Sequence, residues 1–179
     1  DGRSQVGLVT CTAIDEYLDN TIKKHELTRE DKEQDRIKHV DACNANTGPI
    51  FLTYRGQEDI NNIIAETMKN KPVVNFTADD GVIHRVWVID NEETIGRLVE
   101  NFKKVGNFYI ADGHHRCASA VKVGLMRREE HPDYTGDEEF NYFLSVLFPD
   151  EQLAIMDYNR VVKDLNGLTA DAFIEALEN

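Results

Sequence analysis

The stretch 107-NFYIADGHHRCASAVKVGLMRREEH-131 decides most of what the sequence predicts about the fold. Its first residues are apolar and aromatic, as in a buried strand. After Gly113 the apolar residues recur at helical spacing until His131 and Pro132 end the pattern. We therefore predict a strand that passes directly into a helix, with four charged or titratable residues at the junction: Asp112, His114, His115 and Arg116.

Such a junction is suited to an anion. The N–H groups of the first helical turn lack partners within the helix, and the helix dipole places partial positive charge there. Gly113 permits a sharp turn or a close approach of ligand to backbone. Arg116 can hold two phosphate oxygens, and His114 and His115 add hydrogen-bond donors. Asp112 can cap the helix, bind a metal ion or accept a proton.

The alternative interpretation is an ordinary N-cap at Asp112 followed by surface histidines. Against it, each charged basic residue at a helix N-terminus is destabilised by roughly 0.3–1 kcal/mol, which favours an external anion. We predict no metal centre from this stretch, because adjacent histidines rarely converge on one ion and no nearby Cys or Glu completes a ligand set.

The composition restricts the class of protein. The chain has 179 residues, of which 41% are hydrophobic and 30% charged, as in globular proteins. A net charge of −13 disfavours binding to nucleic acid or acidic membranes, and no apolar run approaches the roughly 20 residues of a membrane span. We expect a cytoplasmic protein with reduced thiols, with Cys11 and Cys43 in the core. The sequence leaves the oligomeric state open.

The remaining pattern mixes strands and helices without strict alternation, which favours an α+β fold over a doubly wound sheet. We expect one domain over residues 1–179, and the absence of an initial Met indicates a fragment or a processed chain. The predicted strands are 5–14, 21–27, 50–54, 72–89 as a hairpin, 107–112, 141–148 and 152–162. The predicted helices are 29–43, 58–70, 92–105, 113–130 and 169–179.

The helix predicted over residues 29–43 carries a basic stripe. Thr28 is a candidate N-cap, and Arg29, Lys32 and Arg36 recur on one face. A solvated face of mixed charge explains this pattern as well. In the functional interpretation the stripe faces bound phosphates, and Lys24, His25 and Glu26 line the same cleft, with Glu26 as a candidate general base.

Four segments together resemble a bacterial family of unknown function, DUF1015: YIADGHHRCASA, KHELTREDKEQDR, TGPIFLTYR and DYNRVVKDLNG. The Asp-Gly-His-His-Arg block in turn is similar to the nucleotide-phosphate motif of the ParB/sulfiredoxin superfamily, which includes free serine kinases. This resemblance implies a ParB/sulfiredoxin-like mixed sheet with surrounding helices. It also implies that Gly113, His114, His115 and Arg116 hold nucleotide phosphates, with Asp112 as a candidate catalytic or metal-side carboxylate.

The chain departs from parts of that superfamily. Sulfiredoxins place a reactive Cys directly before the His-Arg pair, where this chain has His114, so their repair chemistry is not supported. The DNA-binding helices of ParB are not evident either. The resemblance therefore favours an ATP- or ADP-dependent, Mg²⁺-assisted kinase of a small hydroxyl metabolite, with serine as the leading acceptor. The alternative is a non-catalytic module that binds a nucleotide or another anion, and a weaker third interpretation is a hydrolase that uses the histidine pair.

Overall fold

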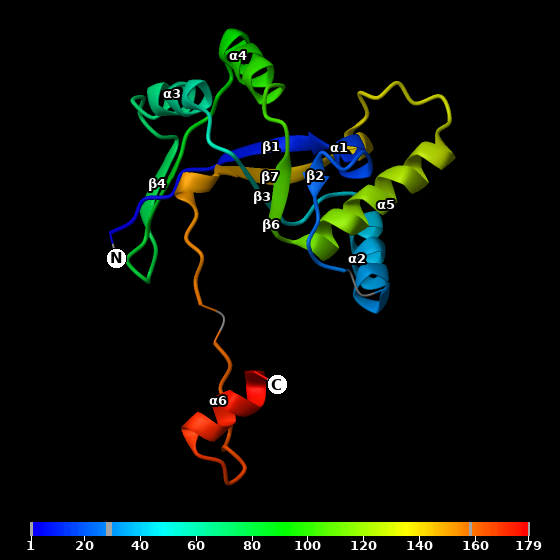
Figure 1. Ribbon diagram of the computed structural model, residues 1–179. Helices are drawn as coiled ribbons and strands as arrows, with labels where there is room; N and C mark the ends of the chain where they lie inside the picture. The colour runs from blue at the N-terminus through cyan, green and yellow to red at the C-terminus, as the bar shows by residue number, and fades with distance from the viewer. Residues whose placement is uncertain (1, 28–29, 158, 179) are drawn as a thin grey trace.

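A mixed five-stranded sheet forms the centre of the protein. The computed structural model describes residues 2–27, 30–157 and 159–178. The strand order is β1-β7-β3-β6-β2 (Figure 1). The strands are β1 (Leu8–Ala13), β2 (Ile22–Lys23), β3 (Ile50–Tyr54), β6 (Phe108–Asp112) and β7 (Tyr142–Pro149).

Parallel and antiparallel pairings both occur in this sheet. β1 with β7 and β3 with β6 are antiparallel, whereas β3 with β7 and β2 with β6 are parallel. The structure thus confirms the predicted α+β class. β2 lies at the sheet edge and pairs Ile22 with Phe108 and Lys23 with Tyr109, so the predicted strand over 21–27 is shorter than expected.

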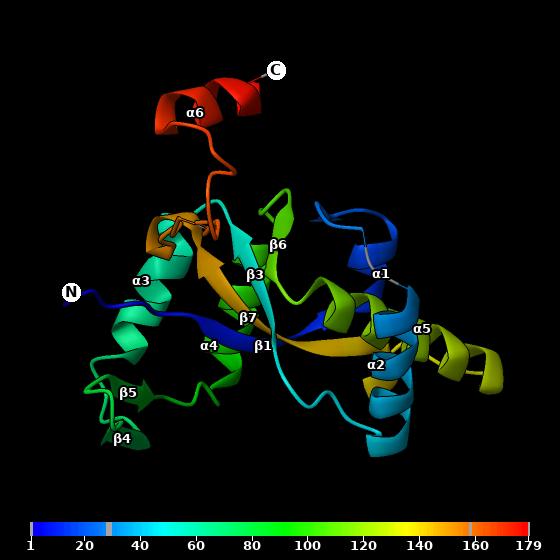
Figure 2. The same cartoon turned by 90° about the horizontal axis from the view of Figure 1, so that it is seen from below.

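The helices largely confirm the predicted periodicity. They are α1 (Ile14–Leu18), α2 (Glu30–Cys43), α3 (Glu58–Thr67), α4 (Glu92–Phe102), α5 (His114–Glu130) and α6 (Ala170–Glu178), with short 3-10 turns at Glu139–Asn141 and Asp150–Gln152. α2 and α5 lie side by side in both views (Figures 1 and 2), whereas α6 lies away from the sheet. None of the helices in the described residues is long and apolar enough to span a membrane.

Polar contacts join α2 to α5, one of them to the buried carboxylate of Glu33. The Ser119 hydroxyl donates to the backbone carbonyl of Glu33 at 3.3 Å, and Lys122 pairs with the Glu33 side chain. Arg127 pairs with Asp41 nearer the other end of α2 at 2.5 Å. α2 has little apolar surface to bury, so these contacts determine where its charged face lies.

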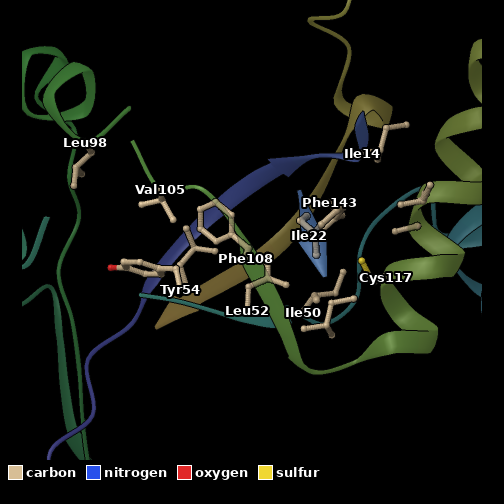
Figure 3. Packing of buried hydrophobic residues seen from close by; sticks show 14 of the residues in the cluster. Ile14, Ile22, Ile50, Leu52, Tyr54, Leu98, Val105, Phe108, Cys117 and Phe143 are labelled. Carbon is tan, nitrogen blue, oxygen red and sulfur yellow. The ribbon is translucent and has the colours of Figure 1, made fainter. Parts of the chain in front are cut away.

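The core follows the alternation of β3. Ile50, Leu52 and Tyr54 are buried while the residues between them are less so, and they pack with side chains from β6 and β7 (Figure 3). The Tyr54 ring lies 5.9 Å from the Phe108 ring, centroid to centroid. This packing anchors β6, whose last residue is Asp112.

The predicted hairpin is confirmed as a separate two-stranded sheet of β4 (Val74–Thr77) and β5 (Ile83–Val86). Gly81 adopts φ 83° in the connecting turn, as the Asp-Gly signal predicts.

Two expectations were wrong. The described residues of 152–162 contain no strand: the segment pairs with neither edge of the sheet, β1 or β2, and its Ile155 and Val161 are almost fully exposed. Cys11 and Cys43 are exposed, and it is Cys117 that is buried. Cys11 belongs to the less buried face of an edge strand, and Cys43 ends α2.

Candidate functional site

The junction between β6 and α5 is a left-handed turn at one glycine. Gly113 has φ 94° and ψ 31°, occupies the N-cap position of α5, and offers no side chain to cap the helix. Its carbonyl accepts the first helical bond, from Cys117 N–H at 2.8 Å. No acidic residue lies in the first turn. The turn therefore presents the positive end of a long helix without a side-chain cap from the N-cap residue.

Arg116 folds back over this turn. Its Nη2 lies 2.6 Å from an Asp112 carboxylate oxygen. A Cβ on Gly113 would meet Nε and Nη2 of Arg116 at 3.0 Å each. The absence of a side chain at position 113 is thus what lets the guanidinium lie close to the helix terminus.

The parallel pairing of β2 with β6 carries a distant segment to the same place. The chain leaves β2 at Lys23 in the direction in which β6 approaches Gly113. Three residues later the Glu26 carboxylate reaches His114, with Oε2 3.4 Å from Nδ1. Lys24 holds the connection by donating to the Tyr17 carbonyl at 2.8 Å and lying over the Tyr17 ring.

His114 is not a surface residue. It is 4% exposed, and its Nε2 is buried with no hydrogen-bond partner among the described residues. Its ring meets the ring of His25 edge-on, with centroids 4.4 Å apart. Burial, followed by the proximity of His25, lowers the pKa of His114, while Glu26 and Asp112 oppose the shift. The ring is therefore mainly uncharged at neutral pH and does not repel the helix dipole.

α2 supplies the opposite wall of a hollow of about 610 Å³. The lining residues come from the segment after β2, from α2 and from the β6–α5 junction: Glu26, Asp31, Lys32, Asp35, Arg36, Asp112, Gly113, His114, His115 and Arg116. A larger hollow of about 890 Å³, beside the other end of α2, contains none of the predicted site residues.

The charges of the smaller hollow are mixed. Its carboxylates are Glu26, Asp31, Asp35 and Asp112, and its permanent cations are Lys32, Arg36 and Arg116. Cations and a helix N-terminus suit phosphate oxygens, whereas carboxylates suit a hard divalent cation. The arrangement is suited to a metal–phosphate pair better than to a bare anion.

All but one of the predicted site residues line this hollow. Glu26, Asp112, the Gly113–Arg116 block, Lys32 and Arg36 meet there. Arg29 and the candidate N-cap Thr28 lie outside the described residues. Their roles stay predictions.

The structure adds residues that we did not assign. Asp31 and Asp35 face the hollow, and their i,i+4 spacing beside Lys32 and Arg36 was the available signal. Lys24 and His25, which we predicted to line the cleft with Glu26, are not among the residues that line this hollow. The ring of His25 instead contacts the ring of His114.

The comparison with protein families identifies the class of protein. The chain matches the model described as "Protein of unknown function (DUF1015)" over residues 1–179, and it belongs to that family. No curated protein and no solved structure matches the chain.

Proposed function

We propose that this protein transfers a phosphoryl group from a nucleotide to the hydroxyl of a small metabolite at the hollow between α2 and the start of α5. One observation carries the proposal: a carboxylate suited to accept a proton, Glu26, shares a single hollow with a helix N-terminus and three cations. Phosphoryl transfer depends mainly on positioning and on charge stabilisation.

The phosphate-binding part of the site is the β6–α5 junction. The first-turn N–H groups of α5 and the Arg116 guanidinium would hold phosphate oxygens. Lys32 and Arg36 face them from α2. Because Arg116 pairs with Asp112 in this structure, binding of phosphate would exchange one anionic partner for another.

The chemical step assigned to the chain is proton removal. Glu26 would take the proton of the acceptor hydroxyl as its oxygen attacks the terminal phosphorus, while the bond to the bridging oxygen of the nucleotide breaks. The exposed Glu26 side chain, at 59%, can reach a substrate in the open hollow. Its approach to His114 restricts its orientation.

A bound Mg²⁺ would neutralise phosphate charge during transfer. The carboxylates that fit this ion are Asp112 and, across the hollow, Asp31 and Asp35. They stand beside the cations, so a nucleotide–Mg²⁺ pair fits the donor set.

The acceptor class comes from resemblance. The Asp-Gly-His-His-Arg block is similar to the phosphate motif of free serine kinases in the ParB/sulfiredoxin superfamily, and we extend to this chain the fold relationship and the preference for serine or a related hydroxyl acid. The second candidate is a nucleotide sensor without turnover. The Asp112–Arg116 ion pair favours it, since that pair can be exchanged for phosphate without chemistry.

The experiment uses this chain with ATP or ADP and Mg²⁺. Isothermal titration calorimetry measures binding, and transfer of labelled phosphate to serine, threonine or glycerate measures turnover. Binding with transfer supports the kinase. Binding without transfer to any hydroxyl acid supports the sensor. The absence of any nucleotide binding contradicts both.

A further inference from the structure

The segment after β2 and the first residue of α5 bring three metal-ligand side chains together. His25, Glu26 and His114 each offer one ligand atom, and these atoms all lie within 4.8 Å of one another. Among the described residues no other group of three His, Cys, Asp or Glu side chains is arranged in this way. Two of the three side chains are exposed and can adjust.

The spacing inside the cluster resembles a metal site more than a hydrogen bond. Nδ1 of His114 and Oε2 of Glu26 are 3.4 Å apart, which exceeds the usual range of roughly 2.7–3.2 Å for a hydrogen bond. Zinc–ligand distances of about 2.0–2.2 Å in a tetrahedron place neighbouring ligand atoms roughly 3.3–3.6 Å apart. These two atoms are therefore already as far apart as two ligands of one zinc ion, and only the exposed His25 side chain has to move closer.

The ring of His114 is held so that one nitrogen faces the cluster. Its Nε2 is buried, whereas its Nδ1 faces Oε2 of Glu26. Nδ1 is therefore the nitrogen that can coordinate an ion together with Glu26. α5 fixes the ring at the helix start, so one ligand of the cluster is held in place before any ion arrives.

We propose that His25, Glu26 and His114 form a binding site for a divalent transition-metal ion of the zinc class. Two imidazole nitrogens and one carboxylate oxygen are a ligand set that zinc and cobalt accept, whereas Mg²⁺ prefers oxygen alone. Three protein ligands leave a further position open for water or a substrate. This site differs from the Mg²⁺ position of the proposed kinase, and it departs from our sequence-based expectation that the histidine pair belongs to no metal centre.

The two sites share one residue. A zinc-class ion bound through Glu26 occupies the oxygen that the proposed function uses as general base. If that function holds, zinc lowers phosphoryl transfer without displacing the nucleotide. This consequence rests on the proposed function, whereas metal binding itself does not.

The test measures metal binding without nucleotide. The chain is stripped with a chelator and titrated with Zn²⁺ by isothermal titration calorimetry, and Co²⁺ is added separately to record its visible ligand-field absorption. An exposed pair on α2 competes, because His39 Nε2 lies 3.9 Å from Cys43 Sγ. Cys43→Ser removes that pair and is the background for every variant.

In that background we expect one Zn²⁺ per chain and tetrahedral-type Co²⁺ absorption. His25→Ala should weaken Zn²⁺ binding about ten-fold or more, the scale seen when a zinc site is disturbed, and should abolish the Co²⁺ band. His84→Ala, a histidine of the exposed hairpin, is the matched control and should change neither.

Two results overturn the proposal: no Zn²⁺ binding in the Cys43→Ser background, or equal affinity in the His25→Ala and His84→Ala variants. Because His25 is exposed, its variant should fold, and far-ultraviolet circular dichroism checks this. His114→Gln is a second variant that should also lose the ion; because His114 is buried, circular dichroism checks the fold of this variant as well. Nucleotide binding measured on the His25→Ala variant separates failure of this proposal from failure of the kinase.

Discussion

Oε2 of Glu26 lies 3.4 Å from Nδ1 of His114, although the two residues belong to segments far apart in the chain. The contact exists because β2 runs parallel to β6, and both strands point at the start of α5. It places a carboxylate at the rim of a hollow whose opposite wall carries cations. The proposed function uses this carboxylate as the general base and the neighbouring start of α5 to hold phosphate.

Replacing Arg116 should weaken nucleotide binding. Arg116→Ala removes a charged donor beside the helix N-terminus, and we expect a loss of roughly 1.5–3 kcal/mol in binding free energy, the range for a hydrogen bond to a charged group. Isothermal titration calorimetry measures it. Arg97→Ala, on the exposed side of α4 and away from the hollow, should bind as the parent does. Equal affinities for the two variants would exclude Arg116 from the phosphate site.

Removing the charge of Glu26 separates catalysis from binding. Glu26→Gln should leave nucleotide affinity nearly unchanged and lower turnover by about 10²–10⁴-fold, the contribution of a general base. Single-turnover phosphoryl transfer in metal-free buffer with added Mg²⁺ measures the effect. Asp35→Asn is measured beside it for comparison, because it removes the charge of another carboxylate in the same hollow. Unaltered turnover in Glu26→Gln would remove Glu26 from the chemical step.

Replacement by alanine should change the stability of the protein in opposite directions at Gly113, in the β6–α5 junction, and at Gly96, in α4. Gly113→Ala forces a Cβ into φ 94° and within 3.0 Å of Arg116, so we expect a destabilisation of roughly 1–2 kcal/mol. Gly96 lies inside α4 with open space around it, and Gly96→Ala should stabilise by roughly 0.4–1 kcal/mol. Urea unfolding distinguishes the signs, and equal shifts would contradict the left-handed junction.

The three thiols should differ in reactivity. Burial raises the pKa of the Cys117 thiol to about 12, so it remains protonated and inaccessible at pH 8. Cys11 and Cys43 are exposed. Ellman's reagent should therefore titrate two thiols in the folded protein and the third only after unfolding. Fast reaction of all three would show that the start of α5 opens readily.

Glu138 should make stability depend on acid pH. The backbone N–H of Thr135, helped by that of Gly136, lowers the pKa of Glu138 to about 2. Its stabilisation is complete above the ordinary pKa of about 4.5 and is lost as the pH falls toward 2, since the unfolded chain takes up the proton first. The urea midpoints of the parent and Glu138→Gln should converge over this interval. Glu139 is the exposed neighbour of Glu138. The urea midpoint of Glu139→Gln should therefore depend on pH in the same way as that of the parent.

The fold could be predicted where periodicity is local. The alternation of Ile50, Leu52 and Tyr54 indicates β3, and the pattern after Gly113 indicates α5. The segment around Ile155 misled the prediction, because β-branched residues indicate a strand only where a neighbour is available to pair.

The same distinction applies to the site. The motif residues from Asp112 to Arg116 are contiguous and could be found by reading. The contact of His25 with His114 depends on the parallel pairing of β2 with β6, which the strand predicted over 21–27 does not specify. The burial of His114 was equally hidden, since two adjacent histidines at a helix start look alike in sequence. The parallel pairing of β2 with β6 brings His25 and Glu26 against His114, and this distinguishes His114 from its neighbour.

The short pairing of β2 has a consequence for local stability. Two residue pairs and a hydrogen bond from Phe108 N–H to the Thr21 carbonyl attach this edge to β6, so we expect the exposed segment bearing Glu26 to open while the other strands stay paired. Local opening of this kind has a lower free energy than global unfolding. A ligand that touches both Glu26 and the start of α5 would bind the attached form alone, and amide hydrogen exchange at the β2 edge would slow with ligand concentration. The exchange rate at the β2 edge would then measure the fraction of the protein that has bound ligand.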